Sequence, residues 1–525
     1  MLIVVAQLNF SVGDLQGNTR KILDVFKIHR DKDLVIFPEL SISGYPPQDL
    51  IFNSQFVKEN RELLSVIARE CPTSAVVGFI DSSDGCFYNA AAIIQENRIT
   101  GIQYKILLPN YDVFDERRYF TPGKTQQLFT IQGHKIGVEI CEDLWEQGYE
   151  DKPTSHLLEM GAEIIINISA SPFCTGKAQE RISLAQSYSA IPLFVYCNLV
   201  GGQDELIFDG QSFVLQKGTL VRLGRSFQED IFVIDSDMSF SPLVFTSGEE
   251  ESLFRALTLG LRDYCEKNYF NRIVFGLSGG IDSSLVACIA AEAMGAQNVT
   301  ALFMPSRYTS SESREDACLL AQNLGISLII LPIDNIFSTY NTTLAPVFSG
   351  LTEDVTEENI QARIRGNLLM AYSNKFGHLV LPTGNKTELA LGYCTLYGDM
   401  SGGLAVIGDV SKIQVYELAQ YYNTMKGKII IPERVFSRPP SAELREGQVD
   451  PFDYSVVSPL VDLIIEERLS KPELISLGYE PELVSSILKR IHSNEYKRRQ
   501  AAPVLKITKK AFGGGRRFPI ANQYI

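Results

Sequence analysis

The 525-residue sequence lacks several features whose absence narrows the class of protein. It has no apolar stretch near the roughly 20 residues of a membrane-spanning helix. The apolar run at residues 2–6 is too short for a signal peptide and lacks a basic segment before it. None of the nine cysteines forms a Cys-x-x-Cys pair, and the five histidines show no spacing typical of metal ligands. We therefore expect a reduced, cytoplasmic protein with no membrane partner.

Basic residues are in the minority, with 48 Lys and Arg against 62 Asp and Glu and a formal net charge of −14. This excess of acidic residues argues against a general nucleic-acid binder and against a protein of anionic membrane surfaces. Internal repeats and low-complexity tracts are absent as well. The length predicts two to three domains, each able to bury a core of its own.

What the sequence does contain is a glycine-rich turn between an apolar strand, Ile273–Phe275, and a helix over Ser283–Met294. Glycines let a backbone approach a ligand closely, and the free N–H groups at a helix start favour an anion. Asp282 would be able to hold a cation beside that anion. The turn predicts a phosphate-binding loop, with an ordinary strand-to-helix turn as the simpler alternative. Its residues are Gly276, Leu277, Ser278, Gly279, Gly280, Ile281, Asp282 and Ser283.

Two better-known phosphate loops are excluded by residue type and spacing. No lysine follows the glycines, as a Walker A loop requires, and the glycines do not fit the G-x-G-x-x-G pattern of dinucleotide-binding folds. The stretch SGGIDS at residues 278–283 instead resembles the SGGxDS loop of the ATP pyrophosphatases, which cleave ATP to AMP and pyrophosphate. That resemblance implies that the loop binds ATP.

Residues up to about 245 alternate short apolar strands with helices, which predicts mixed α/β layers. Three polar residues end or follow strands there: Glu39 in LVIFPEL, Lys105 after GIQY and Cys141 after KIGVEI. A cysteine nucleophile needs a base for its proton and donors for an oxyanion, and a carboxylate and a lysine supply these. Each residue alone also has an ordinary explanation, as a solvated cap, a surface lysine or a core cysteine.

Together and in this order, the three residues resemble the Glu-Lys-Cys triad of the nitrilase, or carbon–nitrogen hydrolase, superfamily. The resemblance implies an N-terminal α-β-β-α sandwich. It also implies that Glu39 is the base and that Cys141 is the nucleophile. Lys105, helped by the backbone N–H of Glu142, would stabilise the oxyanion.

The same resemblance assigns residues around that triad. Tyr111, Ser171 and Lys177 match positions that bind glutamine in the glutaminase members of the superfamily. Glu116 matches a second active-site glutamate, which orients the lysine. Each of these four residues has an ordinary position on the surface as its alternative.

A joint rich in serine and acidic residues, at residues 235–251, precedes a second half with β-α-β-α order. This order predicts a parallel, doubly wound sheet of Rossmann-like type, with ligands at the carboxyl ends of its strands. A polar loop follows one such end at residues 382–388. The long glycine-rich segment 393–412 is typical of a ligand cover rather than of a core. We place the domains at residues 1–245 and 246–525.

Residues 246–525 resemble the NAD synthetases, and the nitrilase-like first half corresponds to the glutamine-dependent members of that family. The motifs are LSGGIDSS, EENIQARIRGNLLM, LPTGNKTE, YGDMSGG with GDVSK, and the tail KITKKAFGGGRRFPIANQYI. On composition alone, residues 513–517 of the tail would pass as a flexible basic end. The resemblance makes it an ordered segment that contacts substrate.

The resemblance also assigns residues to the substrates of this family, which are ATP, deamido-NAD and glutamine. Thr383 would contact ATP in addition to the phosphate loop. The candidate contacts to deamido-NAD are Asn359, Glu388 and Lys510, with the neighbouring Lys509 as an alternative to Lys510. Mg²⁺ prefers oxygen ligands, and its candidate ligands are Asp282 and Glu388.

These assignments imply a ligase that activates the carboxylate of deamido-NAD as an acyl adenylate and amidates it with ammonia from glutamine. Three alternatives remain on the sequence alone. They are another glutamine-fed ATP pyrophosphatase, an amidase whose second half binds nucleotide as a regulator, and a non-catalytic interaction protein. The family also implies a homo-oligomer, of a size that the sequence does not fix.

Overall fold

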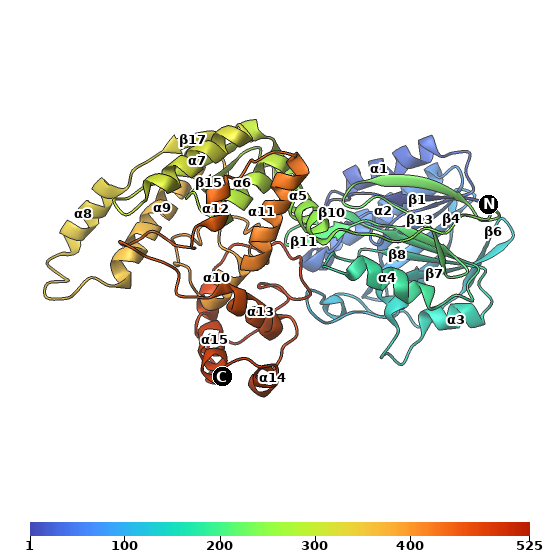
Figure 1. Ribbon diagram of the computed structural model, residues 1–525. Coiled ribbons are helices and arrows are strands. Elements are labelled where there is room, and N and C mark those ends of the chain that lie inside the picture. Colours follow the sequence, from blue (N-terminus) through green and yellow to red (C-terminus); the bar gives the residue numbers. More distant parts are fainter. Residues whose placement is uncertain (525) are drawn as a thin grey trace. The chain divides into compact units, whose positions relative to one another are not determined.

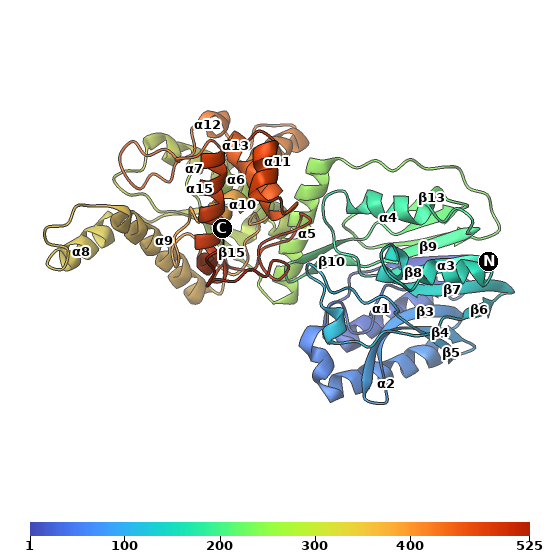
Figure 2. The same ribbon diagram turned by 90° about the horizontal axis from the view of Figure 1, so that it is seen from below.

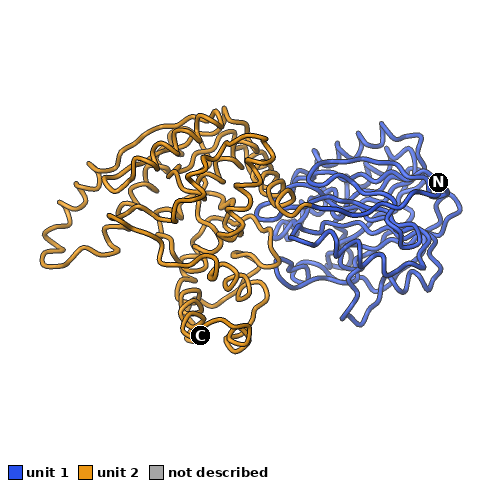
Figure 3. The backbone as a smooth tube through the Cα atoms, viewed as in Figure 1, with its two compact units in different colours: residues 1–247 blue, residues 248–525 orange. Residues whose placement is uncertain are grey.

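The chain forms two compact units in the computed structural model, which describes residues 1–524 (Figure 3). The first unit contains residues 1–247, and the second begins at Gly248. Each unit has its own sheets and its own buried cores. Within residues 1–524, no helix is both long enough and apolar enough to cross a membrane.

Two six-stranded sheets form the centre of the first unit (Figure 1). The first sheet contains, in spatial order, β14 (Asp230–Asp235), β1 (Leu2–Gln7), β2 (Leu34–Ile36), β3 (Ser74–Ser83), β4 (Cys86–Gln95) and β5 (Arg98–Tyr104). The second contains β13 (Thr219–Leu223), β12 (Phe213–Gln216), β9 (Leu193–Asn198), β8 (Ile164–Ser169), β7 (His134–Ile140) and β6 (Leu128–Ile131). A separate hairpin pairs β10 (Val200–Gln203) with β11 (Leu206–Asp209).

Side chains along these strands alternate between two cores, because successive strand residues point to opposite faces. On β8, Ile164, Ile166 and Ile168 lie in the core between the sheets, whereas Ile165 lies in the core under the helices. The outer face of the first sheet packs against α1 (Leu15–Ile28) and α2 (Ser54–Glu70). That of the second packs against α3 (Pro153–Glu159) and α4 (Lys177–Gln186). Figure 2 shows these layers in succession, and the predicted α-β-β-α sandwich is confirmed.

A four-stranded parallel sheet forms the centre of the second unit. Its spatial order is β17 (Ser327–Ile330), β16 (Val299–Phe303), β15 (Ile273–Gly276) and β18 (Leu379–Leu381). The chain therefore reverses its direction across the sheet at β15, and doubly wound sheets bind ligands at such a switch point. The predicted parallel, doubly wound sheet is confirmed.

Helices surround this sheet and extend beyond it. The first group contains α5 (Glu249–Lys267), α6 (Ile281–Met294), α7 (Ser311–Leu324), α8 (Asp334–Leu344) and α9 (Val355–Phe376). The second contains α10 (Lys386–Leu391), α11 (Lys412–Lys426), α12 (Glu433–Ser437), α13 (Tyr454–Ile465), α14 (Lys471–Ser476), α15 (Pro481–Ser493) and α16 (Glu495–Arg498). Residues of α8 and α9 share one core with alternate residues of β15, β16 and β18. A further core joins α10, α13 and α15.

The helix after the glycine-rich turn begins earlier than the sequence pattern predicted. Helix α6 begins at Ile281 rather than Ser283, directly after the N-cap Gly280. Helix α9 begins at Val355, directly after its N-cap Asp354. The reason is a capping box, in which the side chains of Asp354 and Glu357 satisfy each other's backbone N–H groups.

The segment 393–412 corrects a prediction, because part of it builds a core. Leu404, Val406, Ile407 and Val410 have no exposed surface. Asp409, in the same run, is equally buried and accepts hydrogen bonds from the tail. Tyr393, Cys394, Leu396 and Met400, earlier in the segment, pack in the helical core as well, so the glycine-rich composition misled the prediction.

The tail after α16 is an ordered part of the second unit. Asp409 accepts hydrogen bonds at 2.8 Å from the backbone N–H groups of Ile507 and Thr508, and from the Thr508 hydroxyl. Val504 pairs with Ala405 in a parallel bridge, and Phe512 is buried in the helical core. Arg516, in the stretch for which a flexible basic end was the alternative, also lies 2.7 Å from the buried Glu495, which argues against that alternative.

Candidate active sites

A buried cluster of charges lies in the first unit at the ends of β2 and β5. The Nζ atom of Lys105 is 2.7 Å from Glu39 Oε1 and 2.8 Å from Glu116 Oε1. Glu39 also accepts hydrogen bonds from Asn89 Nδ2 at 2.6 Å and from the backbone N–H of Ala170 at 2.8 Å. The structure thus brings together three of the residues that the sequence singled out, although they lie far apart along the chain.

The electrostatics of this cluster follow from its burial. Burial alone would lower the pKa of Lys105, but the charges of Glu116 and Glu39 raise it well above its usual value. Burial raises the pKa of Glu116 to about 7, while Lys105 opposes that shift. Tyr45 donates a hydrogen bond of 2.9 Å to the same Glu116 oxygen. Lys105 is therefore a permanent cation held by two carboxylates.

Cys141 lies directly after β7, at the first position of the 3₁₀ turn η3 (Cys141–Trp145). Its φ of +47° is in the left-handed region, which few non-glycine residues adopt. Burial raises the pKa of the thiol well above its usual value, and the charge of Glu39 adds to that shift. Lys105 acts in the opposite direction. A thiol in this environment is protonated at neutral pH and needs a base before it can attack.

The predicted glutamine contacts lie around the turn that carries Cys141. The Tyr111 hydroxyl donates to the carboxylate of Glu142, at 3.1 and 3.0 Å from its two oxygens. Lys177 places its Nζ atom 3.5 Å from the centre of the Trp145 ring. The charge of Lys177 also lowers the pKa of Glu142, although burial raises it overall. Tyr111 and Lys177 therefore both face the η3 turn.

Ser171 is buried beyond the end of β8. Its backbone N–H donates to Asn198 Oδ1 at 3.0 Å, and its carbonyl accepts from Asn198 Nδ2 at 3.4 Å. It follows Ala170, whose N–H reaches Glu39. Asn198 therefore fixes the backbone next to the charge cluster.

The glycine-rich turn of the second unit lies between β15 and α6, at the switch point of the parallel sheet. The Ser278 and Ser283 hydroxyls are 3.0 Å apart, and the N–H of Gly280 donates to Ser278 Oγ at 3.2 Å. Gly279 has a φ of +84°, and a Cβ atom there would lie 2.3 Å from the carbonyl oxygen of Ser313. Only glycine fits this close approach to α7.

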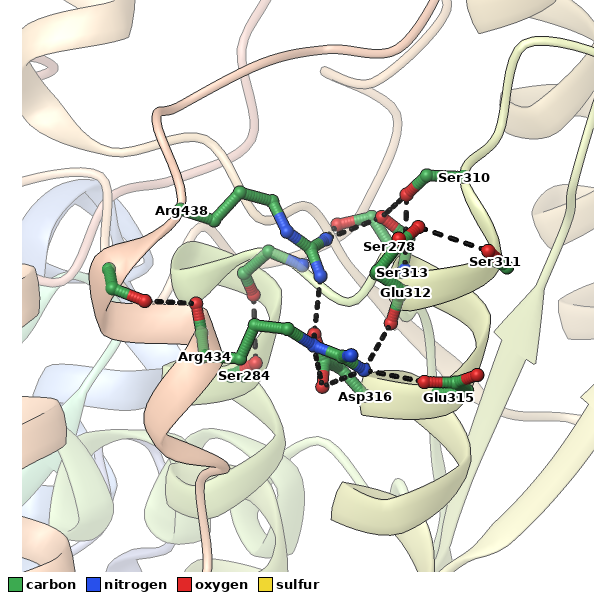
Figure 4. A network of polar contacts seen from close by, with 12 residues as sticks. Ser278, Ser284, Ser310, Ser311, Glu312, Ser313, Glu315, Asp316, Arg434 and Arg438 are labelled. Atoms are coloured by element: carbon green, nitrogen blue, oxygen red, sulfur yellow. Dashed lines mark hydrogen bonds and ion pairs between the residues drawn. The ribbon is translucent and has the colours of Figure 1, made fainter.

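Figure 4 shows why α7 is firmly placed beside that turn. Arg434 Nε donates to Asp316 Oδ1 at 3.1 Å, and Arg438 pairs with the same carboxylate. Arg438 Nη1 also donates to the Ser313 hydroxyl at 2.6 Å. The two arginines therefore fix the first turns of α7, on which Gly279 rests.

Asp282 and Glu388, the predicted Mg²⁺ ligands, are joined by a lysine. The Nζ atom of Lys412 lies 2.5 Å from Asp282 Oδ2 and 3.4 Å from Glu388 Oε1. Asn385 Nδ2 donates to Asp282 Oδ1 at 2.7 Å. Burial and the charge of Asp282 raise the pKa of Glu388 to about 8, which Lys412 partly opposes. The two carboxylates are oxygen ligands of the type that Mg²⁺ prefers, and the Lys412 ammonium occupies the position between them.

Residues 1–524 contain no group of three or more His, Cys, Asp or Glu side chains that could hold a metal ion. A Mg²⁺ ion at Asp282 and Glu388 would therefore depend on bound nucleotide for further ligands. Lys412 was not singled out by the sequence analysis, although the structure places it between the two carboxylates. It lies in the quoted GDVSK motif, and only the fold reveals its contacts.

The remaining predicted residues lie on neighbouring loops of the second unit. Thr383 is half-buried in the loop between β18 and α10, whose next residues reach Asp282. Asn359, on α9, accepts a hydrogen bond of 2.7 Å from the Thr395 hydroxyl. Lys510 is half-buried, whereas Lys509 is exposed and lies 3.4 Å from Glu467. This difference in burial favours Lys510 over Lys509 as the residue directed into the unit.

Comparison with protein families gives one match for each unit. The carbon-nitrogen hydrolase family matches residues 2–239, and the NAD synthase family matches residues 253–501. These ranges lie within the first and the second unit, respectively.

Relatives match over nearly the whole chain. The glutamine-dependent NAD(+) synthetase of Thermotoga maritima is 45% identical over 99% of this chain and 98% of its own length. That of Synechocystis is 44% identical over 99% of both chains. Among solved structures, the glutamine-dependent NAD(+) synthetase of Acinetobacter baumannii, in complex with adenosine diphosphate, is 39% identical with a TM-score of 0.80. It covers 99% of this chain, and 98% of its own chain is matched.

Proposed function

The chain belongs to the glutamine-dependent NAD(+) synthetases, and we propose that its first unit hydrolyses glutamine at Cys141 while its second unit activates deamido-NAD with ATP. The observation that carries the first assignment is the buried contact of Lys105 with Glu39 and Glu116. Buried charges are costly, so three of them beside a cysteine support a catalytic role.

In the proposed glutaminase reaction, Glu39 accepts the proton of the Cys141 thiol, and the thiolate attacks the carboxamide carbon of glutamine. The Lys105 ammonium and the backbone N–H of Glu142 stabilise the negative oxygen of the tetrahedral intermediate. Glu39 then returns the proton to the departing nitrogen, and ammonia leaves with a thioester on Cys141. Water hydrolyses that thioester, with Glu39 again as the base, and releases glutamate.

The other residues of the first unit would hold the reactants in place. Glu116 accepts from Tyr45 and contacts Lys105, so it would keep the ammonium directed at the oxyanion. Tyr111, Ser171 and Lys177 would bind the polar groups of glutamine. Their common position around the Cys141 turn and Asn198 supports this assignment.

In the second unit, residues 276–283 would bind the phosphates of ATP, with Thr383 as a further contact. The nicotinate carboxylate of deamido-NAD would attack the α-phosphate, which gives an acyl adenylate and pyrophosphate. Ammonia would then displace AMP and form the amide of NAD. Asn359, Glu388 and Lys510 would bind the dinucleotide. The Acinetobacter baumannii enzyme is in complex with adenosine diphosphate, which supports the binding of an adenine nucleotide.

Asp282 and Glu388 would hold Mg²⁺. When bound, this ion would neutralise charge on the phosphates. Lys412 already lies between the two carboxylates and would add a positive charge that remains in the site. The family resemblance also supports a homo-oligomer, which light scattering of the purified protein would test.

The deciding experiment compares two nitrogen sources in the Cys141→Ala variant. We expect synthesis of NAD from glutamine to be lost and synthesis from ammonium salts to remain, because only glutamine hydrolysis uses the thiol. NAD, AMP and glutamate are followed together. Cys86→Ala, at the start of β4, is the matched control and should keep both activities. Loss of both activities in Cys141→Ala alone would show that the division of labour is wrong.

A further inference from the structure

One buried carboxylate, that of Asp143, has no part in the reaction described above. It lies in the η3 turn two residues after Cys141, and only 1% of its surface is exposed. Its two oxygens accept three hydrogen bonds, all from backbone N–H groups. A carboxylate that binds three main-chain donors fixes the chain segments that carry them.

The donors come from two segments that lie more than 30 residues apart along the chain. Asp143 Oδ2 accepts from the N–H of Ile140 at 3.0 Å, the residue directly before Cys141. Asp143 Oδ1 accepts from the N–H groups of Ile106 and Leu107 at 3.0 and 2.8 Å. These two residues directly follow Lys105. A single side chain therefore ties the segment of the nucleophile to the segment of the oxyanion donor.

The backbone conformation at Cys141 needs support from neighbouring groups, and the hydrogen bond from Ile140 to Asp143 provides such support. Cys141 has a positive φ, which costs about 1–2 kcal/mol for a residue with a Cβ atom and needs support from its surroundings. The backbone of Lys105 is held on its other side, where its N–H donates to Asn89 and its carbonyl accepts from Gly123. Asp143 supplies the link between these two segments.

We propose that Asp143 is a positioning residue for glutamine hydrolysis, which sets the separation between the Cys141 thiol and the Lys105 ammonium. This inference rests on the proposed function, because it requires both groups to act in the same reaction. Burial raises the pKa of Asp143 to about 7, and the three backbone N–H donors oppose that rise. These donors favour the ionised carboxylate, which accepts hydrogen bonds at both oxygens. An asparagine has one acceptor oxygen, so its amide N–H₂ would face a backbone N–H and leave a buried donor without a partner.

The test compares Asp143→Asn with the parent chain in steady-state glutamine hydrolysis. We expect kcat to fall roughly 10- to 100-fold, the loss typical of a small displacement of reacting groups, with the KM for glutamine within about threefold. Synthesis from ammonium salts should not change. Asp33→Asn is the matched control, because Asp33 also accepts a backbone N–H, from Leu2 at 2.6 Å, away from the charge cluster.

Three results would overturn the inference. An unchanged kcat would show that the separation does not depend on Asp143. A lower melting temperature of the first unit, together with a fall in kcat and a comparable rise in KM, would show a purely structural role. The third is an equal loss of kcat in Asp33→Asn. Cys141→Ala is measured in parallel: if it still hydrolyses glutamine, the proposed function itself fails. If Asp143→Asn does not fold, Asp143→Glu replaces it, because glutamate keeps the charge and displaces it. The expected result is again a lower kcat with a nearly unchanged KM for glutamine.

Discussion

Glu139, two residues before Cys141, is a buried carboxyl that the proposed reaction does not use. Asn167 Nδ2 donates to its Oε1 at 2.9 Å, and Thr154 Oγ1 lies 2.8 Å from its Oε2. Burial raises the pKa of Glu139 to about 8, and these two partners only partly oppose the shift. The Thr154 hydroxyl has one hydrogen for two acceptors, Glu139 Oε2 at 2.8 Å and the carbonyl of Asp143 at 3.2 Å. A protonated Glu139 that donates to Thr154 therefore satisfies every partner.

This geometry predicts how the stability of the first unit depends on pH. Between the usual glutamate pKa of 4.5 and about 8, the folded state keeps a proton on Glu139 that the unfolded state has lost. The free energy of unfolding therefore falls as pH rises through this window, on the order of 1 kcal/mol per pH unit. Glu139→Gln matches the protonated form and should remove this contribution. Urea unfolding at pH 5, 7 and 9 measures it, and an unchanged slope would contradict the assignment.

Gly279 allows a second prediction at the level of one residue. In Gly279→Ala, the new Cβ would lie 2.3 Å from the Ser313 carbonyl, at a φ of +84°. We expect synthesis of NAD to fall at least about tenfold with either nitrogen source, because the phosphate loop must shift away from α7. Glutamine hydrolysis in the first unit should persist. Gly427→Ala also has a positive φ but meets nothing within 4 Å, so it should retain synthesis.

At the level of elements, strands and the loops after them could be predicted from sequence because apolar runs and polar strand ends are local signals. The order of Glu39, Lys105 and Cys141 along the chain, each at the end of a strand, was enough to predict them as candidate site residues. Partners that come from distant segments were not accessible. Lys412 meets Asp282 across 130 residues, and Asn89 meets Glu39 across 50. Only the assembled sheets bring such pairs together.

The strand pair β4 and β5 shows another limit of sequence patterns. Residues of β4 include three successive alanines, Ala90, Ala91 and Ala92, all fully buried. Alanine has a low strand propensity, so this stretch carries no clear strand signal. Tertiary packing between β3 and β5 decides its conformation. The segment nevertheless supplies Asn89 to Glu39, and its pairing with β5 leads to Lys105.

The attachment of the tail to Asp409 gives a prediction at this same level. Asp409→Asn would replace one of the acceptor oxygens used by Ile507 and Thr508, and it would remove a charge 3.4 Å from the buried Lys386. We expect the second unit to lose on the order of 3 kcal/mol of stability, and NAD synthesis to fall with both nitrogen sources.

Limited proteolysis should then cut the tail of Asp409→Asn faster than that of the parent chain. Glu467→Gln is the control, because Glu467 contacts the tail through an exposed pair with Lys509, and such pairs contribute little. Equal protection of the tail in all three proteins would show that Asp409 does not hold it.

At the scale of the whole molecule, the two units have separate hydrophobic cores. Ile166, fully buried between the two sheets of the first unit, tests this separation. Ile166→Ala should lower the stability of that unit by about 2–5 kcal/mol, the usual cost of a cavity of this kind. Calorimetry should show one of two transitions shifted, with synthesis from ammonium salts unchanged at low temperature. A single transition that shifts as a whole would contradict independent cores.

The clamp of Asp409 on residues 507 and 508 also sets an order of events during synthesis on the ribosome. The first unit closes when β14 pairs with β1, so it has all its strands once residue 235 has emerged. The second unit cannot complete its core until residues nearly 100 positions beyond Asp409 have been translated. During that interval the nascent chain carries a finished glutamine-hydrolysing half and an unfinished synthetase.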